Sequence, residues 1–446
     1  MKKIVLVLLV LSIAMTSIFA SCAGNSQSGT STAPGEATPT PTPTRTKDTI
    51  AVWWSTNDND KTLLDEAWWD FKDVYSKKEG SKYYDVKDKL QLFSMPGNAD
   101  SVTDLELLIM AQSAPDLVRM DHVYVSALGQ KGNVLDLQKE FQATDNLKDK
   151  FIESCWMASS YKKTGAVFGI PFDANTIIFG GKKNLLDQAG VALPTNYDEL
   201  LSTGNILKQQ GFDVDVYTLP CGTDERLNWP VFVFLFYVWR LGGDVLSEDY
   251  SQVIFNDPET GVAALNMMLE LQKQGLISAT NYDEGKTILC DYGTWTLNGF
   301  TEPMVFDLLP TLKEGVERWS GLGLYDFSVV KTSTNPELAY DFAVHFATGK
   351  NSLTDEYYQY TFAKRNNLIP SLKDAAGSSD FTDPVQQQFW EKSVVQLALS
   401  KYRPCVPEWP FIEEELSKAI NSAMKGEKDP TEALETAARA INGRLG

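Results

Sequence analysis

The sequence predicts an α/β protein whose folded part consists of two domains. Apolar runs typical of buried strands alternate with amphipathic helical stretches from residue 48 onward, which favours mostly parallel sheets with right-handed crossovers. A second region of the same kind begins near residue 170. The ~400 residues after position 47 are also enough for two domains of ordinary size.

The first region is predicted to run strand, helix, strand, helix, strand. Residues 49–54 are apolar and indicate a buried strand, and Asp60 is a suitable N-cap for the next helix. In that helix the apolar residues recur at helical spacing: Leu63, Leu64, Ala67, Trp68, Phe71 and Tyr75. Further strands are expected over 90–93 and 116–120, with a helix over 101–112 between them. Ligands meet the carboxyl ends of strands in such sheets, which points to residues 54–60 and to Asp121.

The second region begins with a strand over 176–179 and then becomes mainly helical. The predicted helices cover 197–209, 230–241, 258–274, 336–348, 384–400, 411–424 and 431–441, and strands are expected over 305–309 and 324–330. Asn335-Pro336-Glu337 predicts a sharp helix start, because Pro fits the first helical position.

The N-terminal 47 residues are predicted to lie outside the fold. Lys2 and Lys3 precede an apolar run that is short for a membrane span, so residues 1–21 indicate a secretion signal. The order Phe19-Ala20-Ser21-Cys22 resembles the bacterial lipoprotein signal, which implies lipidation of Cys22; the alternative is an ordinary secretion signal. Residues 22–47 are rich in Gly, Ser, Thr and Pro and predict a disordered tether. We therefore expect a lipid-anchored protein on the extracellular face of the cytoplasmic membrane.

Composition limits the partners and cofactors. The formal net charge of −19 disfavours binding to nucleic acid. Two histidines, His122 and His345, and the absence of C-x-x-C spacing argue against zinc. The run 57–60 has the acidic and amide residues of a calcium loop but lacks the EF-hand Gly and Glu. No metal or cofactor is expected, and the pairing of Cys155, Cys221, Cys290 and Cys405 stays open.

From about residue 48 to the C-terminus the chain resembles the extracellular solute-binding proteins of carbohydrate ABC transporters, of the maltose-binding-protein type. The resemblance is carried by dispersed motifs in the family's order, among them Ala114-Pro115-Asp116, Gly169-Ile170-Pro171-Phe172-Asp173, Asn228-Trp229-Pro230, Gly293-Thr294-Trp295, Leu309-Pro310-Thr311 and Asn335-Pro336-Glu337. Residues 179–183 depart from the family's usual Tyr-Asn-Lys turn.

The resemblance implies a type II periplasmic-binding-protein fold, in which two lobes are joined by a hinge. It implies one lobe over 48–171 plus 311–375 and another over 172–310 plus 376–446. The chain is expected to cross between lobes near 170–173, near 309–312 and around 371–382.

Candidate ligand-binding residues follow from the chemistry of saccharides. Aromatic rings match the apolar face of a sugar, and carboxylates, amides and arginines match its hydroxyls. The resemblance marks Trp295 as a stacking residue, Asp121 and Asp173 as cleft acids, Trp229 through its Trp-Pro pair, and Trp409 as part of a late loop. The full predicted set is Trp54, Asn57, Asp58, Asp121, Asp173, Asp224, Arg226, Trp229, Tyr292, Trp295, Arg365 and Trp409. For most of them a role as a turn, cap or core residue is the competing interpretation.

The expected function is capture of a carbohydrate and its delivery to an ABC transporter permease, by a protein that is a monomer and not an enzyme. A secreted glycosidase or lyase is the alternative; it would need two carboxylates across one glycosidic bond, and acidic residues are too common here for such pairs to be informative. The two histidines support no Ser-His-Asp arrangement. A sugar sensor or adhesin without transport is the third interpretation. The sequence does not distinguish a monosaccharide from an oligosaccharide.

Overall fold

The computed structural model describes residues 48–54, 58–76, 81–84, 89–96, 102–212, 215–218, 229–277, 287–377 and 380–445. The predicted signal, Cys22 and the tether lie outside these residues. The chain from Arg45 to the C-terminus forms one compact unit. In the part of it that the structure describes, no helix has the length and apolar character needed to cross a bilayer.

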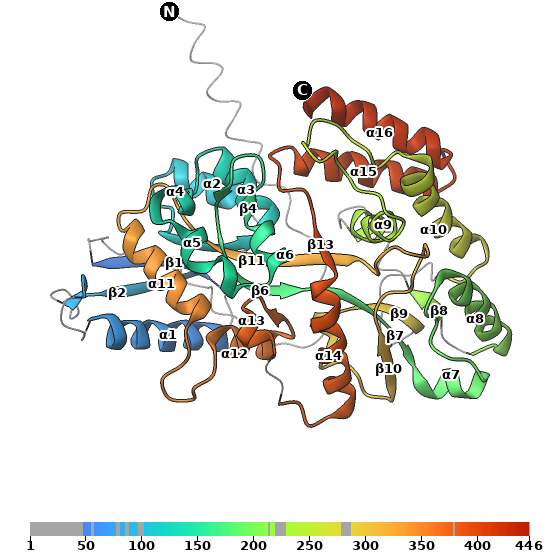
Figure 1. Ribbon diagram of the computed structural model, residues 1–446, viewed down its shortest axis with the longest axis horizontal. Helices are drawn as coiled ribbons and strands as arrows, with labels where there is room; N and C mark the ends of the chain where they lie inside the picture. The colour runs from blue at the N-terminus through green and yellow to red at the C-terminus, as the bar shows by residue number, and fades with distance from the viewer. Residues whose placement is uncertain are drawn as a thin grey trace, which may run out of the picture. The chain divides into compact units, whose positions relative to one another are not determined.

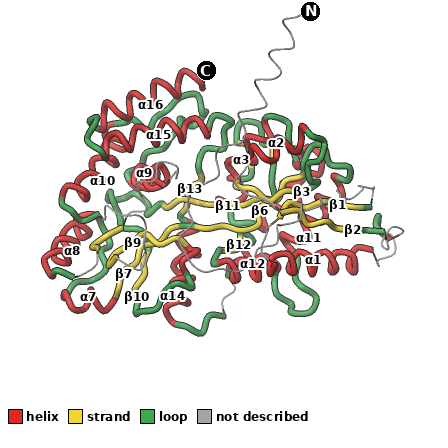
Figure 2. The backbone as a smooth tube through the Cα atoms, turned by 180° about the vertical axis from the view of Figure 1, so that it is seen from behind, coloured by secondary structure: helices red, strands yellow, loops and turns green. Residues whose placement is uncertain are grey.

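One sheet has seven strands in the order β12-β6-β11-β3-β1-β2, with β13 paired to the start of β11 (Figure 2). The strands are β1 (Thr49–Trp54), β2 (Gln91–Pro96), β3 (Leu117–Asp121), β6 (Ile170–Asn175), β11 (Ser320–Val329), β12 (Ile369–Pro370) and β13 (Ser400–Tyr402). Neighbouring residues of β1 enter different hydrophobic clusters, Val52 one and Trp53 another, because side chains alternate between the faces of a sheet.

Helices cover both faces of this sheet (Figure 1). The face that contains Val52 packs against α1 (Asp58–Ser76), α11 (Pro336–Thr348) and α12 (Tyr358–Asn366), and the face that contains Trp53 packs against α2 (Val102–Met110) and α3 (His122–Gln130). Shorter elements complete this region: α4 (Leu137–Phe141), α5 (Ala143–Leu147), α6 (Glu153–Ala158), β4 (Ser160–Tyr161), β5 (Ala166–Val167) and α13 (Lys373–Ala376).

The other main sheet has four strands in the order β10-β7-β9-β8. They are β7 (Ile177–Lys182), β8 (Asp215–Thr218), β9 (Thr287–Gly293) and β10 (Met304–Asp307). The helices of this region are α7 (Lys183–Ala189), α8 (Tyr197–Gln210), α9 (Trp229–Arg240), α10 (Ala263–Lys273), α14 (Pro384–Ala398), α15 (Trp409–Met424) and α16 (Pro430–Leu445). One hydrophobic cluster joins α8, α9, α10, α15 and α16 to the sheet.

The α/β class is confirmed, but both sheets are mixed rather than mostly parallel. β1 is parallel to β2 and β3, whereas β11 is antiparallel to both β3 and β6. The reason is the path of the chain: β6 leads out of the seven-stranded sheet into β7, and β11 brings the chain back after β10, so the two strands run in opposite directions (Figure 2). The chain leaves again between β12 and α14, which packs against β10. The predicted lobe boundaries stay a prediction.

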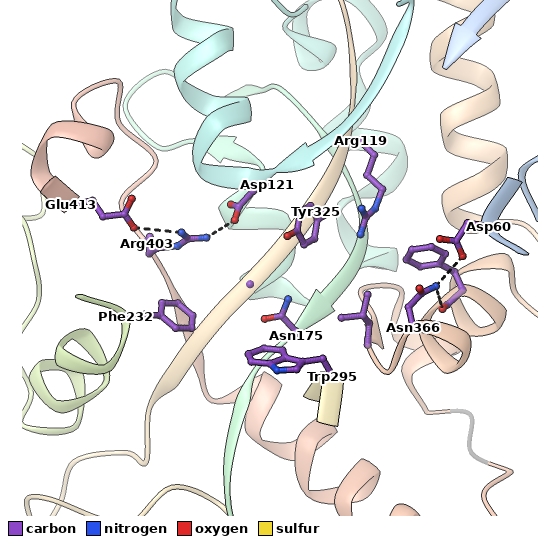
Figure 3. A pocket seen from close by; sticks show the side chains of 13 residues that line it. Asp60, Arg119, Asp121, Asn175, Phe232, Trp295, Tyr325, Asn366, Arg403 and Glu413 are labelled. Atoms are coloured by element: carbon purple, nitrogen blue, oxygen red, sulfur yellow. Dashed lines mark hydrogen bonds and ion pairs between the residues drawn. The ribbon is translucent and has the colours of Figure 1, made fainter. Parts of the chain in front are cut away.

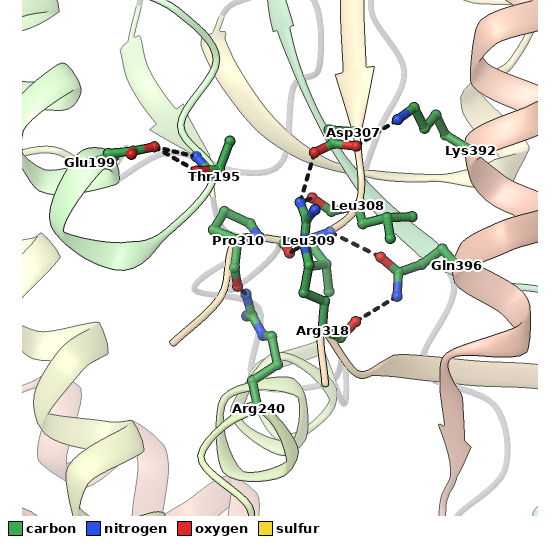
Figure 4. Close-up of polar contacts among 10 residues, drawn as sticks. All are labelled: Thr195, Glu199, Arg240, Asp307, Leu308, Leu309, Pro310, Arg318, Lys392 and Gln396. Atoms are coloured by element: carbon green, nitrogen blue, oxygen red, sulfur yellow. Dashed lines mark hydrogen bonds and ion pairs between the residues drawn. The ribbon is translucent and has the colours of Figure 1, made fainter. Parts of the chain in front are cut away.

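The returning segment 308–310, which follows β10, is held by side chains rather than by a sheet (Figure 4). Gln396 accepts from the Leu309 amide at 2.9 Å and donates to the Arg318 carbonyl at 2.7 Å. Arg240 donates to the Pro310 carbonyl at 2.8 Å. These bonds satisfy backbone groups that would otherwise be buried without partners.

Most long predicted elements are present, with shifted ends. The helix after β1 begins at Asp58, so Asp60 lies in its first turn and does not cap it, contrary to the prediction. The predicted helix over 258–274 is a short π-helix at Pro258–Val262 followed by α10. α11 begins at Pro336 as predicted, although the Asn335 side chain donates to the Thr49 carbonyl at 2.6 Å and does not cap the helix.

Candidate functional site

A cavity of about 570 Å³ lies beside β6 and β11, where these strands run between the two sheets (Figure 3). Its walls come from both regions of the fold. The region of the seven-stranded sheet contributes Asp60, Arg119, Asp121, Asn175, Gly323, Tyr325, Phe362, Asn366 and Leu368. The segments that pack with the four-stranded sheet and α15 contribute Phe232, Trp295, Arg403 and Glu413.

Arg119 forms a buried ion pair with Asp173 at one side of the cavity. Its Nε and Nη2 donate to the two Asp173 oxygens at 2.8 and 2.7 Å, the bidentate geometry that binds a carboxylate most firmly. The guanidinium carbon lies 4.2 Å from the centre of the Tyr325 ring, which favours the cation further. Burial alone would lower the pKa of Arg119, but Asp173 outweighs burial and raises it. This arginine is a fixed cation with its counter-ion attached.

Arg403 lies between Asp121 and Glu413 at the other side of the cavity (Figure 3). Its Nη2 is 2.7 Å from Asp121 Oδ2, and its Nη1 is 3.8 Å from Glu413 Oε1. Burial would raise the pKa of Asp121, but Arg403 and His122 hold it well below its ordinary range. Burial raises the pKa of Glu413 to about 7, because the more distant Arg403 offsets it only in part.

Trp295 and the α12 terminus form the aromatic and amide part of the site. Trp295 is in a short 3-10 turn directly after β9, and a side chain at Gly293 would overlap its ring, since a Cβ there would lie 2.2 Å from a ring carbon. Asn366 donates to Asp60 Oδ1 at 3.1 Å. Asn367 donates to the Trp295 carbonyl at 3.1 Å and so connects α12 to the turn that carries the ring.

The structure brings three of the predicted site residues together. Asp121 and Trp295 line the cavity, and Asp173 lies directly behind Arg119. In the same wall, Asp121 also accepts from the Val123 amide at 3.1 Å and thereby caps α3, so the predicted competing role as a cap is present as well.

Three predicted aromatic residues lie in the hydrophobic core and not in the cavity wall. Trp54 is 2% exposed and packs against Phe172 and Phe327. Tyr292 is buried on β9, and Trp409 is fully buried at the start of α15. Large aromatic side chains bury the most apolar area, so the same residue type serves a core and a sugar cleft equally well.

Asp58 and Arg365 do not line the cavity. Asp58 is exposed at the start of α1, where it pairs with Lys61, and Arg365 donates to the Asn59 carbonyl at 3.2 Å. Trp229 is the first residue of α9. Asn57, Asp224 and Arg226 lie outside the described residues.

Sequence reasoning missed most of the polar cavity wall, including Arg119, Arg403 and Glu413. One signal was present: Arg119 stands inside the apolar run Leu117-Val118-Arg119-Met120, and a charge inside a buried strand requires a partner. No comparable local pattern marks Arg403 or Glu413, whose roles depend on contacts with a distant part of the chain.

Cysteines and possible metal ligands among the described residues are further candidates for components of a site. Cys155, Cys290 and Cys405 are buried free thiols, and Cys221 lies outside the described residues. Among the side chains that the structure describes, no group of three or more His, Cys, Asp or Glu residues is arranged to hold a metal ion.

Comparisons with known proteins agree on one family. The family model of the bacterial extracellular solute-binding protein matches residues 75–388. The galactooligosaccharide-binding protein of Bacillus subtilis (strain 168) is 26% identical over 209 residues, which cover 46% of this chain and 44% of the relative. The match thus spans less than half of that relative's length.

Solved structures show the same fold. The cyclic alpha-maltosyl-1,6-maltose binding protein from Arthrobacter globiformis has a TM-score of 0.72 at 22% identity, covering 89% of this chain and 98% of that one. UgpB from Mycobacterium tuberculosis, in complex with glycerophosphocholine, has a TM-score of 0.69 at 15% identity, covering 89% and 98%. The predicted two-lobed type II periplasmic-binding-protein fold is confirmed by these likenesses.

Proposed function

The chain belongs to the family of bacterial extracellular solute-binding proteins, and on that premise we propose that it captures an oligosaccharide in the cavity beside β6 and β11 and delivers it to the permease of an ABC transporter. Binding draws the two lobes together, because a ligand favours the closed state when it contacts both lobes only in that state.

One observation carries the choice of a saccharide: a tryptophan ring lies opposite a wall of carboxylates, amides and guanidiniums (Figure 3). Trp295 matches the apolar C–H face of a sugar ring, and Asp60, Asn175 and Asn366 match its hydroxyls. The B. subtilis relative is named for galactooligosaccharides, whereas UgpB binds glycerophosphocholine, so the fold alone does not decide between a sugar and a phosphodiester.

The N-terminal sequence supports the rest of the proposal. Residues 1–21 act as a secretion signal, Cys22 carries the lipid, and the tether to residue 47 holds a monomeric receptor beside the permease in the same membrane. Globomycin treatment, which blocks lipoprotein signal cleavage, should leave the protein with its signal attached; normal processing would contradict lipidation.

The binding test replaces Trp295 by Ala and measures affinity for galacto- and malto-oligosaccharides by calorimetry. We expect a loss of about 2 kcal/mol or more, roughly 30-fold in Kd, because a central aromatic contact is removed. The matched control is Trp69→Ala, since Trp69 is 57% exposed on α1 and does not line the cavity. Equal affinities of the two variants would exclude Trp295 as a stacking residue.

Two further experiments distinguish this function from an enzyme and from a sensor or adhesin. A binding protein returns the oligosaccharide unchanged, whereas release of shorter sugars would favour the glycosidase or lyase. Deletion of the gene should abolish uptake of the bound sugar; unchanged uptake would favour a sensor or adhesin.

A further inference from the structure

We propose that the cavity selects its ligand by charge and excludes saccharides that carry a carboxylate, phosphate or sulfate group. This inference rests on the proposed function and names the chemical class of ligand that the site accepts.

Each cation among the described lining residues already holds a carboxylate. Arg119 gives two of its N–H groups to Asp173, at 2.8 and 2.7 Å. Arg403 gives one to Asp121 at 2.7 Å and has Glu413 at 3.8 Å. Both arginines are therefore neutralised donors, able to reach a sugar hydroxyl but with no net charge to offer an anion.

Among the described residues around the cavity, negative charge exceeds positive charge. Asp60 also lines it and is nearly fully buried, and its hydrogen-bonding partner Asn366 is an uncharged amide. Four carboxylates thus accompany two guanidiniums, and the acids remain in excess even when Glu413 is protonated. In a partly buried site this excess is weakly screened by solvent and salt.

An anionic ligand would have to displace one of these carboxylates to reach an arginine. Asp173 has no solvent exposure and Asp121 is largely buried, so a displaced carboxylate would stay in the protein without its partner. Breaking a buried ion pair in this way costs more than the new contact returns. A neutral sugar only needs donors and acceptors that leave both pairs intact.

The experiment compares matched ligands that differ in one group. Galactobiose, maltotriose and cellobiose are each measured by calorimetry beside the counterpart in which the terminal C6 hydroxymethyl group is a carboxylate. We expect the acidic counterpart of the best neutral ligand to bind at least tenfold more weakly.

Asp121→Asn tests the cause of this selection. Asn remains a good N-cap for α3 but no longer neutralises Arg403, so the preference for the neutral ligand should narrow at least threefold. Asp145→Asn is the control: it removes the same charge from an exposed position on α5 and should leave the ratio unchanged. Glu413→Gln is the second variant and should shift the ratio in the same direction.

The outcomes separate this inference from the proposed function. An acidic sugar that binds the wild type as tightly as its neutral counterpart, or an unchanged ratio in both Asp121→Asn and Glu413→Gln, would overturn the charge selection while leaving a sugar receptor. If none of the sugars binds, the proposed function fails and the selection fails with it.

Discussion

At the residue scale, Asp121 joins two parts of the fold with one carboxylate. One oxygen accepts from the Val123 amide and fixes the start of α3, and the other accepts from Arg403, which follows β13. The pair is stable in a buried site because opposite charges are joined by a short charge-assisted hydrogen bond, although Arg403 Nε is buried and makes no hydrogen bond. Glu413 has the longer contact with Arg403, at 3.8 Å. Its protonation should therefore change the stability of the protein measurably.

We predict that Glu413 makes the protein less stable as the pH rises from about 4.5 to 7. Burial raises the pKa of Glu413 to about 7 in the folded state, against the ordinary value of 4.5. Between these values the folded state binds the proton and the unfolded state does not, so the stabilisation present below pH 4.5 is lost as the pH rises through 7. The shift corresponds to about 3 kcal/mol.

The measurement is urea unfolding of the wild type and Glu413→Gln at several pH values from 4.5 to 8. The difference in free energy of unfolding should change with pH in favour of the variant, and Glu435→Gln, an exposed change on α16, should show no such trend. A pH-independent difference would show that Glu413 is ionised throughout.

At the element scale, Gln396 is one of the side chains that hold the crossing segment 308–310, together with Arg240 and Arg318. Gln396 on α14 is fully buried and binds the Leu309 amide and the Arg318 carbonyl, which lie near the two ends of the loop that leads from β10 to β11 (Figure 4). Two backbone groups that lack a strand partner are thereby satisfied.

We predict that Gln396→Ala lowers the free energy of unfolding by about 2–4 kcal/mol, since each buried group left without a partner costs about 1–3 kcal/mol. Gln252→Ala, an exposed change near β-bridge residue Val253, should stay within about 0.5 kcal/mol of the wild type. Chemical denaturation of both variants measures the difference. Similar stabilities would mean that water replaces the lost bonds.

Local sequence patterns correctly predicted the elements that depend on residues close together in the chain. The apolar run of β1, the helical spacing in α1 and the Pro336 start of α11 all reflect neighbouring residues, and the structure contains all three. The antiparallel insertion of β11 between β6 and β3 could not be predicted in this way, because it depends on pairing across more than a hundred residues. The prediction of mostly parallel sheets was wrong for the same reason.

The candidate site likewise contains residues that were predicted from the sequence and residues that only the complete fold brings there. Asp121 was predicted because it ends a strand, and Trp295 was predicted from the resemblance in Gly293-Thr294-Trp295. Tyr325 faces the cavity only because β11 returns beside β6. Trp54 and Trp409 entered the predicted set because aromatic type and position in the chain do not distinguish a core ring from an exposed one. Burial is a property of the whole fold.

At the scale of the whole molecule, Asn367 connects the two regions that surround the cavity. It ends α12 in the left-handed conformation, with φ of 57°, and donates to the Trp295 carbonyl at 3.1 Å. Its oxygen accepts from Asn298 at 2.5 Å, and Gln386 at the start of α14 donates to Asn298 at 2.9 Å. The Asn367 side chain therefore contributes hydrogen bonds that hold the two regions together around a ligand.

We predict that Asn367→Gly weakens oligosaccharide binding about 5- to 10-fold, because one or two hydrogen bonds worth about 0.5–1.5 kcal/mol each are lost from the closed state. Gly accepts the left-handed conformation without strain, so α12 should end as before and the unfolding midpoint should change little. Gln142→Gly is the matched control, since Gln142 ends α4 in the same conformation, with φ of 55°, away from the cavity. Calorimetry gives the affinities, and small-angle scattering should show a larger radius of gyration for Asn367→Gly at subsaturating ligand. Equal affinity in the two variants would mean that closure does not depend on the Asn367 contacts and that the ligand alone joins the two regions.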